Sequence, residues 1–148
     1  MLRLKSPLQC HLNVRDCHAG DWERIVDRLS TSAERGPDLG RLQLGTNRDL
    51  RRAMVAEAFR QLERPDSAAH YLALVVEEPR SPGNARLLVW VYSLVHFDLG
   101  ALYAEAGEHE RAIQHYSSFL EAFTRPDSSV AWMREQAQRE LQRLTAER

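Results

Sequence analysis

Cysteine and lysine are scarce in this 148-residue sequence, which holds two cysteines and a single lysine, Lys5. The first ten residues contain no apolar stretch of the kind that a secretory signal requires. Two cysteines without such a signal argue against a disulfide framework and favour a reducing, cytoplasmic compartment. The longest run without a formal charge, residues 87–97, is too short to cross a bilayer, so we expect no membrane insertion.

An excess of charge of either sign is also missing, because 20 basic residues are balanced by 21 acidic ones and the net charge is −1. A nucleic-acid-binding protein usually gathers basic residues on one face. Here acidic and basic residues alternate, most clearly in residues 134–148, which is typical of a solvated helix face with pairs four residues apart. The sequence therefore predicts no nucleic-acid partner.

Glycine and proline are few, and they fall between segments whose apolar residues recur with helical spacing. In one such segment the apolar residues recur every three or four positions from Trp22 to Leu29, and Asp21 is a candidate N-cap. Pro65 opens another helix, because proline is tolerated in a first turn. We predict an all-α fold in a single domain, residues 1–148, with helical hairpins at about 7–35, 47–78 and 85–123 and a last, one-sided helix at about 129–146.

The segment from Ala85 to Ala106 contains residues that favour strands, but its second half keeps strict helical spacing, and we predict one helix that Gly107 ends. Its first half is apolar on all sides. Such a helix is either buried by its neighbours or exposes part of itself, Trp90 and Leu94 in particular, as a patch for binding or self-association. The second alternative would allow a homodimer.

Three short helix connections have midpoints at Gly20, Glu63 and Gly107, which are 43 and 44 residues apart. A regular period of this order indicates a helical repeat array. The third connection lies within a stretch that resembles the tetratricopeptide repeat, a motif with Leu-Gly, an aromatic residue, a turn glycine, a small residue and a second aromatic residue. These are Leu99, Gly100, Tyr103, Gly107, Ala112 and Tyr116.

The other two hairpins match this motif less well. The second has Val55, Phe59, Ala68 and Leu72 in the corresponding places, with Glu63 in place of the turn glycine, and the first has Leu12, Gly20, Ile25 and Leu29. The resemblance implies about three stacked antiparallel hairpins with a C-terminal capping helix, and a concave groove, lined by the first helix of each hairpin, that holds peptides. It places at the groove Leu50, Ala53, Glu57, Arg60 and Gln61 in the second hairpin, and Leu94, Phe97, Ala101, Ala104 and Glu105 in the third.

One cluster of metal-ligand residue types stands near the start, at Cys10, His11, Cys17 and His18. Structural zinc sites usually hold closer cysteine pairs, and we expect two buried thiols there, with no metal and no cofactor. Glycine-rich phosphate loops are absent, and no catalytic triad can be argued from residue order. The sequence therefore does not predict an enzyme.

The favoured function is a protein–protein interaction scaffold or adaptor, which binds a peptide or partner protein through the groove or an apolar helix face. The alternative is a regulatory or sensor domain of a larger bacterial signalling protein, which binds a small ligand between helices. Interaction with another protein distinguishes the first hypothesis, and a pocket with a perturbed titratable group distinguishes the second.

Overall fold

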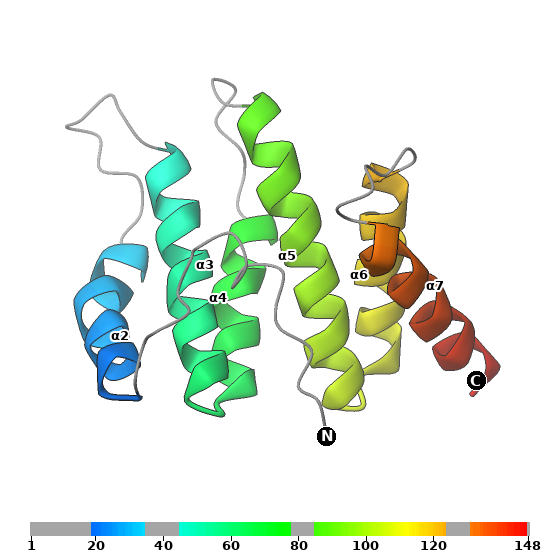
Figure 1. The fold of residues 1–148 in the computed structure, drawn as a ribbon, viewed down its shortest axis with the longest axis horizontal. Helices are drawn as coiled ribbons and strands as arrows, with labels where there is room; N and C mark the ends of the chain where they lie inside the picture. Colours follow the sequence, from blue (N-terminus) through cyan, green and yellow to red (C-terminus); the bar gives the residue numbers. More distant parts are fainter. Residues whose placement is uncertain (1–18, 35–44, 78–84, 124–130, 148) are drawn as a thin grey trace. The chain divides into compact units, whose positions relative to one another are not determined.

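A computed structural model describes residues 19–34, 45–77, 85–123 and 131–147 of the chain (Figure 1). Within these residues all regular secondary structure is α-helical, which confirms the predicted fold class, and residues 85–105 form one helix as expected. The helices are α2 (Ala19–Glu34), α3 (Gly45–Gln61), α4 (Pro65–Glu77), α5 (Ala85–Glu105), α6 (His109–Ala122) and α7 (Ala131–Ala146). The chain divides into two compact units, residues 1–88 and residues 89–148.

In the first unit α3 contacts both α2 and α4. Figure 1 shows α3 and α4 as antiparallel neighbours joined by a short turn. Alanine side chains on both helices are fully buried, which allows the two helix backbones to approach closely. Between them the rings of Phe59 and Tyr71 stack with centroids 5.6 Å apart, and the guanidinium of Arg64 lies 4.9 Å from the centre of the Phe59 ring.

In the second unit the core is aromatic and centres on Phe97 of α5. Its ring packs edge to face against Tyr116 and Phe119 from α6, with centroids 6.0 and 5.2 Å away. The ring of Trp132 from α7 packs edge to face on the same phenylalanine at 6.0 Å, and α6 and α7 also contact each other directly. Phe97 of α5 thus contacts both of the other helices that the structure describes in this unit.

The turns of the two hairpins have the same backbone geometry. After α3, the Arg64 N–H donates to the Phe59 carbonyl over 2.9 Å, and after α5 the Glu108 N–H donates to the Tyr103 carbonyl over 2.8 Å. Each bond spans six residues, and the residue before its donor has a positive φ, 58° at Glu63 and 77° at Gly107. This is the Schellman way of ending a helix, and it recurs 44 positions along the chain, from position 63 to position 107.

The boundaries of some elements differ from the prediction. The expected connection around Gly20 is wrong, because Ala19, Gly20 and Asp21 are the first residues of α2. Glycine costs little there, since the first turn of a helix makes few intrahelical bonds. Asp21 is therefore not the N-cap, although its carboxylate still lies at the positive end of the helix dipole. The predicted first helix of that hairpin, like Cys10, His11, Cys17 and His18, lies outside the described residues.

Candidate functional site: the first-helix surface and a histidine pair

The groove residues expected on α3 divide into buried and accessible ones. Leu50 is 41% exposed, and Arg60 and Gln61 are half-buried. Ala53 and Glu57 are buried. The structure therefore leaves Leu50 exposed and Arg60 and Gln61 partly accessible on this helix, and it places the other two in the interior.

The residues expected on α5 divide in the same way. Leu94 and Phe97 are buried, and Phe97 is the centre of the aromatic core. Ala101 and Ala104 are half-buried, and Glu105 is exposed. Trp90 belongs to α5, but its side chain is not among those described. We use the name first-helix surface for two separate sets of accessible residues, one on each helix: Leu50, Arg60 and Gln61 on α3, and Ala101, Ala104 and Glu105 on α5.

Buried polar side chains lie beside this surface on α3. Gln61 donates a hydrogen bond to a carboxylate oxygen of Glu57 over 2.7 Å, so the accessible amide is fixed by the buried acid one turn earlier. Arg52 is 1% exposed, and its guanidinium donates to the Leu74 carbonyl over 2.8 Å and lies 3.8 Å from the Asp49 carboxylate. Leu74 lies in the last turn of α4, where carbonyls have no partner within the helix. Arg52 therefore fixes the end of α4.

A second arginine has the same role in the other unit. Arg134 of α7 donates to the carbonyls of Leu120 and Phe123, at 3.3 and 2.5 Å, and so satisfies the C-terminal end of α6. A cation at this end also lies at the negative pole of the helix dipole. Neither arginine was identified from the sequence. In the sequence, Arg52 is recognisable only as a basic residue beside the apolar stripe of α3. The carbonyl that it binds could not be predicted, because it is 22 residues away.

The most unusual polar contact joins α5 and α6. The Nδ1 atoms of His96 and His115 lie 2.8 Å apart, and the ring centroids lie 5.1 Å apart. The Tyr103 ring stacks on His115 with centroids 5.4 Å apart, and the Arg111 guanidinium lies 5.2 Å from the centre of that tyrosine ring. Burial, then the charge of His96 and that of Arg111, lowers the pKa of His115 to about 4.

The ring of Tyr116 on α6 packs closely against Gly100 on α5. A methyl group built on Gly100 would lie 2.8 Å from a ring carbon of Tyr116, so only glycine fits at this position. Tyr116 is buried, and burial raises the pKa of its hydroxyl well above the usual range, with Glu140 adding to the effect. The tyrosine is thus a neutral packing residue. The two positions are the glycine of the Leu-Gly pair and the second aromatic residue of the repeat motif.

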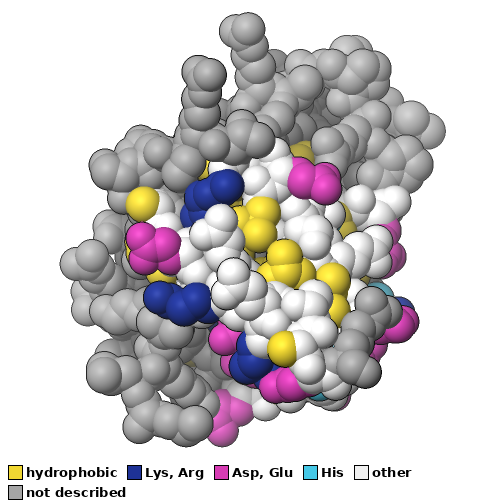
Figure 2. Space-filling view, turned by 90° about the vertical axis from the view of Figure 1, so that its right-hand side faces the viewer, with side chains coloured by type: hydrophobic (Ala, Val, Ile, Leu, Met, Phe, Trp, Pro, Cys, Tyr) yellow, Lys and Arg dark blue, Asp and Glu magenta, His cyan; other side chains and the backbone are white. Residues whose placement is uncertain are grey.

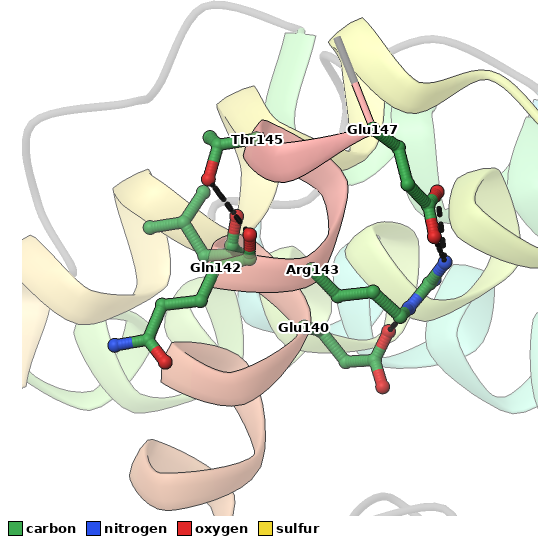
Figure 3. Close-up of polar contacts among 6 residues, drawn as sticks. Glu140, Gln142, Arg143, Thr145 and Glu147 are labelled. Carbon is green, nitrogen blue, oxygen red and sulfur yellow. Dashed lines mark hydrogen bonds and ion pairs between the residues drawn. The ribbon is translucent and has the colours of Figure 1, made fainter.

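The outer side of α7 is mostly polar. Figure 2 shows the face of the molecule on this side, where small hydrophobic areas lie among charged and other side chains. Arg143 binds the carboxylates of Glu140 and Glu147 at 2.9 and 3.0 Å, and hydrogen bonds to these two groups raise its pKa (Figure 3). Thr145 donates to the Leu141 carbonyl over 2.8 Å. Trp132, 40% exposed, is the exception to this polar character.

Comparison with known proteins finds no match to a family model, to a curated protein or to a solved structure. Within the parts of the chain that the structure describes, no three histidine, cysteine or acidic side chains come together as metal ligands. No described helix combines the length and the apolar character needed to cross a membrane.

Proposed function

We propose that this chain is a tetratricopeptide-like interaction module, in which the first-helix surface of each hairpin binds a peptide segment of another protein. The observation that carries this proposal is the recurrence of one hairpin turn, with the same hydrogen bonds and the same positive φ, 44 residues apart. The contact of Gly100 with Tyr116 adds support, because both residues stand at positions of the family motif, the glycine of the Leu-Gly pair and the second aromatic residue. Repeats of this kind use exposed helix faces to hold peptides.

The chemistry of the first-helix surface suits a peptide. The α3 part offers an amide and a guanidinium at Gln61 and Arg60 in its last turn and the apolar Leu50 about three turns earlier, and Gln61 is already oriented by Glu57. The α5 part offers the small side chains of Ala101 and Ala104 beside the carboxylate of Glu105. Small side chains let a peptide backbone approach, and oriented polar groups can hydrogen-bond to it.

Peptide selection tests the proposal and needs no identified partner. A random-peptide display library is selected on the immobilised full chain, and an enriched peptide is titrated into the ¹⁵N-labelled protein. We expect amide shift changes at Gln61 on α3, and at Ala101 and Glu105 on α5. Failure to enrich any peptide over a blank surface, or shift changes confined to α7, would count against the proposal. Changes that appear with protein concentration alone would instead point to a homodimer.

A further inference from the structure

We propose that the hydrogen bond between His96 and His115 makes the α5–α6 hairpin acid-sensitive: it joins the two helices while one proton bridges the imidazoles, and it is lost when both imidazoles are charged. The proposal goes beyond peptide binding and does not depend on it. It rests on the position of two titratable rings on facing helices, 19 residues apart in sequence and 2.8 Å apart at their Nδ1 atoms.

The geometry requires a single bridging proton. The centroid separation of 5.1 Å is close to the largest that a 2.8 Å nitrogen contact allows, so each Nδ1 points at the other ring's Nδ1. One nitrogen must then carry the hydrogen and the other must offer its lone pair. When both rings are imidazolium ions, both nitrogens are donors and the contact becomes a repulsion between like charges. The same alignment leaves no room for a metal ion between the two nitrogens.

Partial burial and the nearby Arg111 cation oppose a second charge on the pair. From α5, the Tyr103 ring stacks on His115, and from α6, the Arg111 guanidinium lies 5.2 Å from the centre of that tyrosine ring. The carboxylate of Glu108 lies 3.1 Å from Arg111 and is engaged there. Both histidines are half-buried, so water only partly solvates an added charge.

The pH range follows from the direction of the shift. The pKa of His115 in the folded chain is lowered to about 4 from the ordinary value of 6.5, first by burial and then by His96 and Arg111. The unfolded chain therefore binds the proton more readily, and the stability of the hairpin is complete above pH 6.5. Stability falls as the pH drops from 6.5 towards 4, and His115 contributes no further change below pH 4.

Thermal unfolding of the full chain between pH 7.5 and 4.5 tests this dependence. We compare the wild type with His115→Gln, which cannot take up the proton, and with His70→Gln, an exposed histidine on α4 as the matched control. On going to pH 4.5, the Tm of the wild type should fall by about 5 °C more than that of His115→Gln, and His70→Gln should follow the wild type. Parallel curves for the wild type and His115→Gln would overturn the proposal.

A measurement on the wild type covers the case in which His115→Gln does not fold. In ¹⁵N NMR spectra of the imidazoles at pH 5.5, His115 of the folded chain should keep one protonated and one unprotonated nitrogen, whereas in the chain unfolded by urea it should be largely charged. A His115 that is charged to the same extent in the folded and in the unfolded chain at this pH would overturn the proposal. So would a rise in Tm on adding one equivalent of Zn²⁺ to the wild type but not to His115→Gln, because the pair would then be a metal site.

Discussion

At the scale of single residues, Glu63 and Gly107 have the same role with different side chains. Both sit at the turn position with positive φ, and only glycine adopts that conformation without steric cost. A methyl group on Gly107 would meet no atom within 4 Å, so substitution there tests the backbone conformation alone.

We therefore predict changes of opposite sign at these two positions. Glu63→Gly should raise the free energy of unfolding by about 0.5–1 kcal/mol, and Gly107→Ala should lower it by about 1 kcal/mol. Urea unfolding followed by circular dichroism measures both. A loss of stability in Glu63→Gly equal to that in Gly107→Ala would show that the two turns are not equivalent.

Gly100 is a packing residue, in contrast to Gly107. Gly100→Ala gains about 1 kcal/mol in helix propensity, but the new methyl group would overlap the buried Tyr116 ring, and we expect a net loss of about 1–2 kcal/mol. In the Tyr116→Leu background the same substitution should cost nothing or stabilise the chain. The double variant has the same pair of residues as Ala56 and Leu72, which stand 44 positions earlier. An identical cost in both backgrounds of this double-mutant cycle would contradict the close contact.

At the scale of helices, arginine side chains complete the C-terminal ends of the second helix in each hairpin. Arg52 reaches the end of α4 from α3, and Arg134 reaches the end of α6 from α7. These bonds satisfy carbonyls that have no partner within their own helix. They fix the helix ends by contact between helices rather than by a local cap.

Arg134→Met should lower the free energy of unfolding by about 1–2 kcal/mol, because charge-assisted hydrogen bonds to two carbonyls are lost. Arg139→Met is the matched control on the same helix, because Arg139 is exposed, and its effect should stay within about 0.5 kcal/mol. Chemical denaturation of both variants makes the comparison. Equal losses at the two positions would show that Arg134 acts through the charge of α7 alone.

The helices themselves were predictable from the sequence, because their apolar residues recur with helical spacing and Pro65 and Gly107 mark boundaries. Spacing also overrode the local strand preference of residues 89–92, since packing decides between weak propensities. What could not be predicted depends on contacts between helices. The His96–His115 pair forms only because α5 and α6 fold back about Gly107, which brings residues 19 positions apart into contact.

The expected groove shows the same limit. Its residues were carried over from the family motif by position, and that motif does not report burial. In this structure Ala53, Glu57, Leu94 and Phe97 are buried, whereas Leu50 and Glu105 remain accessible. Aromatic packing explains the case of Phe97, whose ring contacts α6 and α7 instead of solvent.

At the scale of the whole molecule, two hairpins share one turn geometry, and we propose that their first helices are the ones presented to a partner. Glu105 and Glu121 offer a matched test of this idea. Both are exposed, and both lie in the last turn of a helix, Glu105 in α5 and Glu121 in α6. Arginine is favourable at the C-terminal end of a helix, so neither charge reversal should destabilise the fold.

The most direct measurement is calorimetric titration of a selected peptide into the wild type, Glu105→Arg and Glu121→Arg. If the peptide binds the first-helix surface, Glu105→Arg should weaken binding by about tenfold, or about 1.4 kcal/mol, and Glu121→Arg should leave the Kd unchanged. Thermal unfolding confirms that both variants fold. Equal affinities for all three proteins, or a loss confined to Glu121→Arg, would contradict the claim that the first helices form the binding surface.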